Sequence, residues 1–140
     1  MMFGRRIRTD EDGSTVVELA FALPVFIALV YMVVQLGEVY FAVAGMQQAL
    51  GQGARYATLC LPTSTGCNSP TTGQIKTMIS NSVFGTGIGQ FTVEDPVSGT
   101  AGTSKYYDLT VDYTQSTSLL LFPGPTITVS KSKRVWTAAT

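Results

Sequence analysis

The sequence predicts an α+β fold in which a long N-terminal helix packs against a small antiparallel β-sheet domain with one short helix. The first observation is a nearly uninterrupted apolar run from Leu19 to Val34, followed by apolar residues at helical spacing as far as Ala57. The second is the alternation of apolar and polar side chains within residues 60–140, typical of half-buried strands. A sheet this small cannot bury a core alone, so one of its faces must lie on the helix.

The first half of the helix is long enough to cross a membrane. A segment of about 20 mostly apolar residues, at about 16–37, matches the roughly 30 Å of hydrocarbon in a bilayer. Glu18 lies inside this segment, and a carboxylate there is costly enough to require a functional reason. Pro24 removes one backbone hydrogen bond, which indicates either packing against neighbouring helices or a kink without further consequence.

The flanking charges predict the orientation of this segment. Arg5, Arg6 and Arg8 precede the apolar run, and no Lys or Arg follows it before Arg55. Basic residues stay on the cytoplasmic side of a membrane. We therefore expect residues 1–13 in the cytoplasm and the bulk of the chain outside.

The helix is expected to continue from Ser14 to about Leu59, a length of roughly 70 Å. Its outer part carries one apolar stripe that would pack on the following domain, formed by Val39, Val43, Met46, Leu50, Ala54 and Ala57. Three glycines in this part (Gly45, Gly51 and Gly53) weaken the helix but permit close backbone approach. The predicted parts are thus a leader at 1–13, a helix at 14–59 and an extracytoplasmic domain at 60–140.

The extracytoplasmic domain reads as a short helix and three strands. Ile75, Met78, Ile79 and Val83 recur at helical spacing, with Thr72 as the expected N-cap. The strands are expected at 91–94, at 107–114 and from Ile127 to Trp136, with turns over 95–102.

An apolar run lies before the last strand. Leu119, Leu120, Leu121 and Phe122 are followed by Pro123 and Pro125, which argue against a regular central strand here. Such a run either folds back onto the core or meets another protein. We expect it to fold back.

Two cysteines, Cys60 and Cys67, lie in a loop rich in Pro, Ser, Thr and Gly. Outside the cytoplasm such a pair oxidises, so a disulfide is predicted. A zinc site would need more ligands than two thiolates.

Composition argues against other classes of function. Nine basic and nine acidic residues balance, which gives no electrostatic basis for binding nucleic acid. The absence of His removes the commonest general base and metal ligand, so we expect neither an enzyme nor a cofactor nor a metal. Asp108 and Asp112 lie on one strand face, but Ca²⁺ needs six or more oxygens. We expect them to be solvated or to pair across the sheet with Lys131, Lys133 or Arg134.

The N-terminal region resembles a known family. Gly13 followed five residues later by Glu18, ahead of an apolar helix, resembles the processing site of type IV pilin-like precursors. Residues 12–24 (DGSTVVELAFALP) and 53–57 (GARYA) are similar to TadE-like minor pilins, or pseudopilins, of the tight-adherence (Tad, Flp) pilus system.

The resemblance implies a function and a location. A prepilin peptidase would cut between Gly13 and Ser14, and Glu18 would pair with the N-terminal amine of a neighbouring subunit. The protein would sit in the bacterial inner membrane as a single-pass protein, or in the fibre. Its partners would be other pilins or pseudopilins, the inner-membrane assembly platform and membrane lipid. It would support adhesion and biofilm formation.

Two other interpretations remain open. The chain could be an uncut, signal-anchored envelope protein whose outer domain binds a ligand or partner, with Glu18 at the cytoplasmic headgroups. Alternatively, Ala42-Val43-Ala44 could be the cleavage site of a removable secretory signal, although the apolar run exceeds the usual length of about 7–15 residues.

Overall fold

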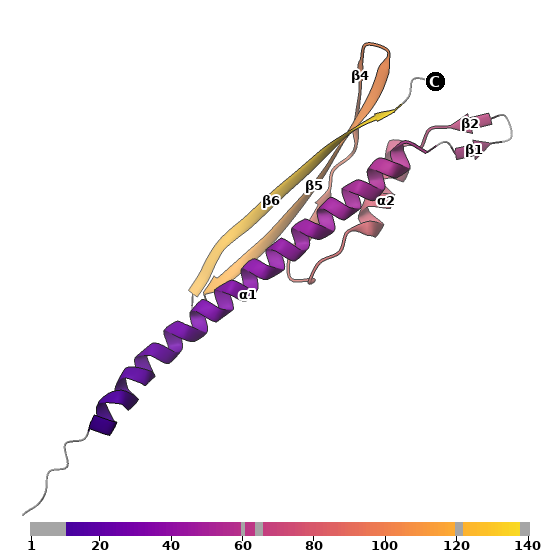
Figure 1. Ribbon diagram of the computed structural model, residues 1–140. Coiled ribbons are helices and arrows are strands. Elements are labelled where there is room, and N and C mark those ends of the chain that lie inside the picture. Colours follow the sequence, from indigo (N-terminus) through magenta and orange to yellow (C-terminus); the bar gives the residue numbers. More distant parts are fainter. Residues whose placement is uncertain (1–10, 60, 64–65, 120–121, 138–140) are drawn as a thin grey trace, which may run out of the picture.

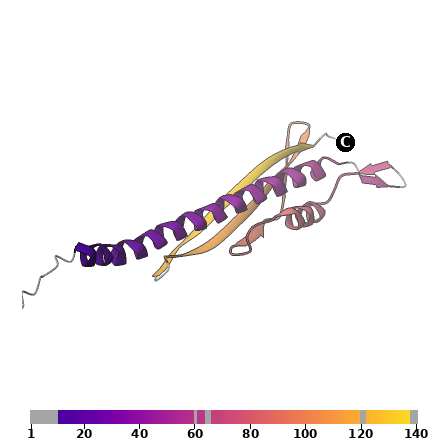
Figure 2. The ribbon, with the colours of Figure 1, turned by 60° about the horizontal axis from the view of Figure 1, so that its bottom comes forward.

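The computed structural model describes residues 11–59, 61–63, 66–119 and 122–137, and it confirms the α+β class. A long helix, α1 (Glu11–Ala57), carries a sheet and a second helix along its C-terminal part (Figure 1). Figures 1 and 2 both show strands β5 and β6 running beside this part, whereas the N-terminal part of α1 extends beyond the sheet. The fold is therefore a rod with a domain along one side.

Helix α1 is 47 residues long, about 70 Å at 1.5 Å per residue. It begins three residues before the predicted start and ends two residues before the predicted end. Its last turn closes with a hydrogen bond from the Thr58 hydroxyl to the Arg55 carbonyl oxygen (2.8 Å). Pro24 lies inside the helix without interrupting it. Loss of one hydrogen bond is tolerated where so many others persist.

The sheet has β5 (Ser104–Leu119) at its centre. Along one edge β5 pairs with both β3 (Gln90–Val93) and β4 (Val97–Ala101), and along the other it pairs with β6 (Phe122–Thr137); all pairings are antiparallel. The prediction of turns alone over 95–102 was wrong, because β4 occupies 97–101. A two-residue turn joins β4 to β5, and Gly102 takes a φ of +62° there.

The two strands predicted on either side of the apolar run were too short: the strand expected at 107–114 is β5, which continues to Leu119, and the strand expected from Ile127 begins before both prolines. Strand β6 begins at Phe122 and passes through both Pro123 and Pro125. Among the described strands β6 pairs only with β5, and an edge strand can accommodate residues that lack an N–H group. As a result β5 and β6 form a hairpin of two 16-residue strands.

Two local predictions between the helices need correction. The N-cap of α2 (Thr72–Ser82) is Thr71 rather than Thr72: its hydroxyl accepts from the Gln74 N–H (3.3 Å), and the Gln74 side chain accepts from the Thr71 N–H (2.9 Å). The segment expected as a loop also contains a short hairpin, β1 (Leu61–Thr63) and β2 (Gly66–Asn68).

The core lies between α1, α2 and the inner face of the sheet. Ile75 and Ile79 of α2 are fully buried against α1, and Leu109, Val111 and Tyr113 of β5 are buried on the other side. Gly53 shows how close the helices are, since a Cβ built there would collide with Ile79. The core therefore depends on small residues of α1 at the contact with α2.

Candidate functional site: the exposed N-terminal half of α1

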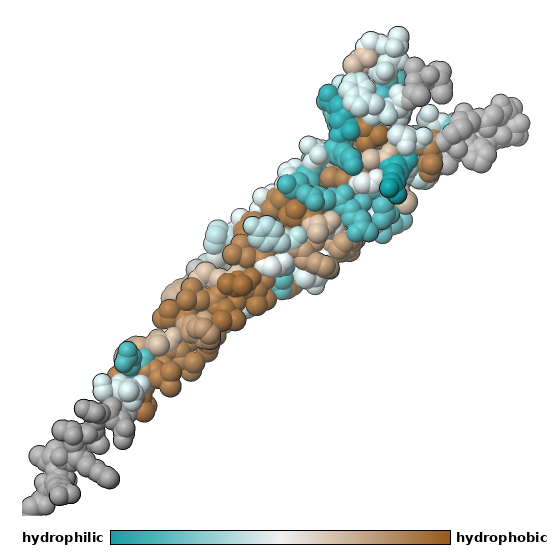
Figure 3. All heavy atoms as spheres, in the orientation of Figure 1, coloured by the Kyte–Doolittle hydropathy of each residue, from teal (hydrophilic) through white to brown (hydrophobic). Residues whose placement is uncertain are grey.

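Residues 14–36, called here the N-terminal half of α1, form an apolar surface that the rest of the described chain leaves uncovered except around Tyr31 and Gln35. Phe21 is 75% exposed and Val33 is 68% exposed, and none of residues 14–36 is buried. By length and composition, α1 is apolar enough to cross a membrane. Figure 3 shows this surface as a hydrophobic band along the lower part of the rod. Lipid or other apolar helices are the surroundings that such a surface requires.

The residues of the predicted processing site lie at the start of α1. Both Gly13 and Ser14 lie within the helix, and Ser14 is exposed. Glu18 is exposed one turn further on, and it is the sole ionisable residue between 14 and 30. A single carboxylate on an apolar surface marks one position along the helix, where a cation of a neighbouring molecule could bind.

The predicted packing residues divide between the two parts of α1. Pro24 lies on the exposed N-terminal half, whereas Val39, Met46 and Leu50 are buried under the sheet and α2, and Val43 is half-buried. The same face carries a line of small buried residues, Ala42, Gly45, Ala49 and Gly53, of which sequence reasoning named the two glycines as points of close approach and missed the two alanines. Their spacing of three, four and four was a readable sign of close helix packing.

Two consecutive side-chain hydrogen bonds join α1 to β5 at the end of the core nearest the N-terminal half of α1. The Tyr113 hydroxyl donates to Gln115 Oε1 (2.7 Å), and Gln115 Nε2 donates to Glu38 Oε2 (3.3 Å). Burial raises the pKa of the Tyr113 phenol above its ordinary value of 10.0, and the negative charge of Glu38 raises it further. The phenol thus stays protonated at neutral pH and remains the donor of the hydrogen bond to Gln115.

The end of the β5–β6 hairpin rests on the N-terminal half of α1. The Ser118 hydroxyl lies 3.1 Å from the Tyr31 hydroxyl, and Gln35 Nε2 donates to the Ser118 carbonyl oxygen (2.8 Å). A register shift between Ser116 and Ser118 precedes these contacts. Contrary to our expectation of folding back, Phe122 points away from the core and is 70% exposed. Leu119 is described by its backbone alone, and Leu120 and Leu121 lie outside the described residues.

The outer face of the sheet carries the ion pair that the sequence offered as one alternative. Arg134 binds Asp108 through two hydrogen bonds of 2.7 Å each, and its guanidinium lies 4.3 Å from the centre of the Tyr106 ring. Arg134 therefore holds the pKa of the Asp108 carboxyl below its ordinary value of 3.8. In the part of the chain that the structure describes, no three acidic or cysteine side chains gather as a metal site would require.

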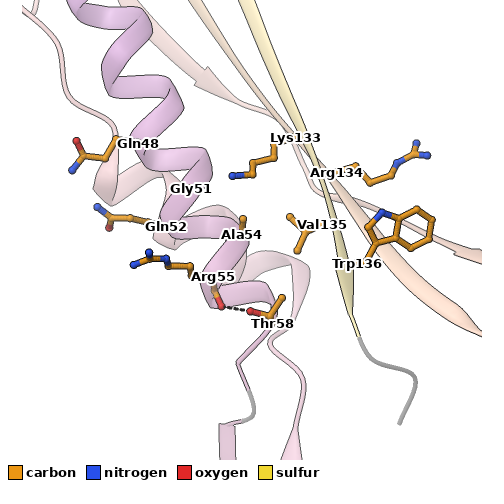
Figure 4. A pocket seen from close by; sticks show the side chains of 10 residues that line it. All are labelled: Gln48, Gly51, Gln52, Ala54, Arg55, Thr58, Lys133, Arg134, Val135 and Trp136. Atoms are coloured by element: carbon orange, nitrogen blue, oxygen red, sulfur yellow. Dashed lines mark hydrogen bonds between the residues drawn. The ribbon is translucent and has the colours of Figure 1, made fainter.

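A groove of about 790 Å³ lies between the end of α1 and β6. Ala54 and Val135 form part of its lining, together with Gln48, Gln52 and the cation Lys133. Figure 4 shows Lys133 pointing toward α1, whereas Arg134 and Trp136 point away from it. This groove lies far along the rod from Glu18, at the opposite end of α1. It is separate from the apolar surface.

The predicted disulfide cannot be placed on this structure. Cys60 lies outside the described residues, and Cys67 is described by its backbone alone, within β2 opposite Pro62. The disulfide stays a prediction.

Comparison with known proteins agrees with the resemblance over the same region. Residues 13–55 match the family described as TadE-like protein. The match covers the exposed half of α1 and most of its buried half, and it ends before the sheet. No curated protein and no solved structure is significantly similar to the chain. A TadE-like N-terminal region with an exposed apolar helix is consistent with an envelope protein associated with a Tad pilus.

Proposed function

We propose that this protein is a minor pilin or pseudopilin of a Tad-type pilus. The observation that carries the proposal is the exposed apolar half of α1, with its single carboxylate, in the region that matches the TadE-like family. Such a helix can exchange lipid for the helices of other subunits, because its large side chains already lie on the surface. The protein serves in assembly of the fibre and so supports surface adhesion and biofilm formation. Its role is structural rather than catalytic.

Processing by a prepilin peptidase begins this pathway. Cleavage between Gly13 and Ser14 removes the cytoplasmic residues 1–13 and leaves Ser14 as the N-terminus. The N-terminal half of α1 then spans the inner membrane, and the sheet domain lies outside it. At the membrane the protein meets the assembly platform. Intact mass and N-terminal sequencing of protein extracted from membranes of cells that contain the peptidase test this step. A start at Ser14 is expected.

Other starts would identify the rival functions. A start at Met1 would indicate a signal-anchored envelope protein outside the pilus pathway. A start at Gly45 would make the apolar run a discarded secretory signal. The structure supplies an argument against that last outcome: Val39 and Ala42 are buried in the core and would be lost with the signal.

Glu18 sets the register between subunits in this proposal. After cleavage it is the fifth residue, close to the new N-terminal amine, and it pairs with the amine of a neighbouring subunit. An unpaired carboxylate in an apolar surface is costly, so a misaligned subunit leaves both charges unmatched. Correct alignment is thereby favoured over alignments displaced along the helix.

A pair of α1 variants tests the role of Glu18. Glu18→Gln removes the charge and keeps the size of the side chain. We expect it to insert into membranes and to be cut at Ser14 as before, while its co-purification with other pilins falls at least tenfold. Glu38→Gln is the matched control, because Glu38 lies on the same helix but faces Gln115 of the sheet. Undiminished co-purification of Glu18→Gln would remove the register role.

A further inference from the structure

We propose that the tip of the β5–β6 hairpin, at Phe122, dips into the outer leaflet of the membrane beside α1. The protein would then contact the lipid at two places, through its helix and through the end of its sheet. This inference rests on the membrane-spanning role of α1 proposed above. It assigns the acyl region of the lipid as the partner of Phe122, an exposed apolar residue that does not pack in the core.

The contacts of Ser118 fix the position of the tip along α1. Its hydroxyl meets Tyr31 and its carbonyl oxygen accepts from Gln35, both within the N-terminal half of α1. Phe122 is the strand partner of Leu119, so it lies one strand residue beyond Ser118 in the direction of the helix N-terminus. The tip is therefore held at the level of the apolar surface rather than above it.

Two independent lengths agree on this position. Near the other end of the contact, a Cβ built on Gly53 would lie 3.6 Å from Leu109 Cδ1, so these two residues are level. The strand from Leu109 to Ser118 rises about 30 Å at roughly 3.3 Å per residue. The helix from Gly53 back to the Tyr31–Gln35 turn also rises about 30 Å at 1.5 Å per residue. The hairpin thus runs straight down α1.

The length of the membrane segment then gives the depth of the tip. A span of about 20 residues that starts at Val16 reaches its outer boundary near Leu36. The Tyr31–Gln35 turn that holds Ser118 is centred three residues, or about 5 Å, inside that boundary. One further strand residue brings Phe122 to a depth of roughly 8 Å. This is the depth of the outer acyl chains.

The chemistry of the tip suits lipid. Residues 113–130 carry no charged side chain, and the exposed Phe122 adjoins three leucines in the sequence. The backbone at Leu119 and Phe122 is paired across the hairpin, which reduces the cost of burying its polar groups. Ile88, 57% exposed, lines the small cavity of about 200 Å³ that Tyr31, Gln35 and Ser118 also line. The lower end of the domain therefore presents apolar side chains from two separate segments.

Quenching of tryptophan fluorescence by brominated phosphatidylcholine tests the proposal on the full chain reconstituted in vesicles. The single native tryptophan, Trp136, lies near the far end of the same hairpin and serves as the internal control. Two variants carry their only tryptophan elsewhere: Phe122→Trp with Trp136→Phe, and Phe26→Trp with Trp136→Phe. The second places the probe on the membrane-spanning part of α1. Circular dichroism verifies that each variant is folded.

The expected result is that brominated lipid removes at least half of the emission of the Phe122→Trp and Phe26→Trp variants and leaves that of Trp136 unchanged. Quenching of the Phe26→Trp variant alone would overturn the tip proposal while the membrane span stands. If the Phe122→Trp emission were blue-shifted yet insensitive to brominated lipid, the tip would be covered by protein and the proposal would fail. Failure of quenching in both variants would overturn the membrane span itself.

Discussion

The two halves of α1 are both apolar, yet only one of them is covered by the protein. The N-terminal half (residues 14–36) presents large side chains such as Phe21 and Phe26 to its surroundings. The C-terminal half (residues 37–57) meets α2 along a line of Ala and Gly, and its Gln52 accepts a hydrogen bond from the Ser82 hydroxyl of α2 (3.0 Å). Apolar content alone therefore does not show which surface a protein buries on itself. In this chain small residues mark the face that meets α2, because they let the two helices approach closely.

The largest expected difference in stability comes from removing a methionine side chain from each half. Met46 is fully buried, whereas Met32 is 40% exposed. Met46→Ala leaves a cavity and should lower the free energy of unfolding of the sheet domain by about 2–5 kcal/mol. Met32→Ala should change it by less than about 0.5 kcal/mol. Urea titration of the full chain in mild detergent, followed by Trp136 emission, measures both. Equal losses would contradict the division of α1.

Two glycines within the C-terminal half show the same contrast between a covered and an uncovered position at a smaller scale. A Cβ at Gly45 would collide with the backbone carbonyl oxygen of Phe84, whereas a Cβ at Gly37 meets no atom within 4 Å. We expect Gly45→Ala to lower the free energy of unfolding by about 1–3 kcal/mol, because a backbone atom cannot move aside as a side chain can. Gly37→Ala should leave stability unchanged or raise it by up to about 1 kcal/mol through helix propensity. The same urea titration measures both variants, and an unchanged stability of Gly45→Ala would mean that α1 does not approach the Phe84 backbone this closely.

The smallest expected effect lies on the outer face of the sheet, away from both contacts of α1. The pKa of Asp108 is lowered by Arg134, so the pair stabilises the fold above the ordinary pKa of 3.8. This contribution is lost as the pH falls through the lower pKa of the folded state. The urea midpoint of Asp108→Asn should therefore lie below that of the wild type at pH 6 and approach it near pH 3.

Asp112→Asn is the control for this acid effect. Asp112 lies on the same strand face, and its strand partner is Ser130 rather than an arginine. Its midpoint at pH 6 should stay closer to the wild type than that of Asp108→Asn. A difference for Asp108→Asn that is as large at pH 3 as at pH 6 would show that the side chain acts by packing, not by charge.

The sequence was sufficient for the fold class because helical spacing in α1 and strict alternation in β5 are strong patterns. It failed where the strand pattern was weak. Strand β4 reads Val-Ser-Gly-Thr-Ala, and only its pairing with β5 makes it a strand. Strand β6 contains two prolines that an edge position accommodates, and edge positions follow from tertiary pairing.

The candidate site was foreseeable in part. Glu18 stood out as a carboxylate in an apolar run, and it is exposed because none of the described segments of the chain covers it. The contacts of Ser118 with Tyr31 and Gln35 could not be foreseen, because they join residues more than 80 positions apart. They depend on the length of the hairpin relative to the helix, which the sequence pattern underestimated by ending one strand at 114 and starting the next at Ile127.

Hydrogen–deuterium exchange of the full chain in lipid nanodiscs, with and without urea that unfolds the sheet domain, tests the division of α1 most directly. Without urea, the amides of both halves should exchange slowly. With urea, the amides of residues 39–57 should become fast, because the domain covers them, while those of residues 16–36 stay slow, because lipid covers them. Simultaneous loss of protection in both halves, or fast exchange over residues 16–36 before urea is added, would contradict this account.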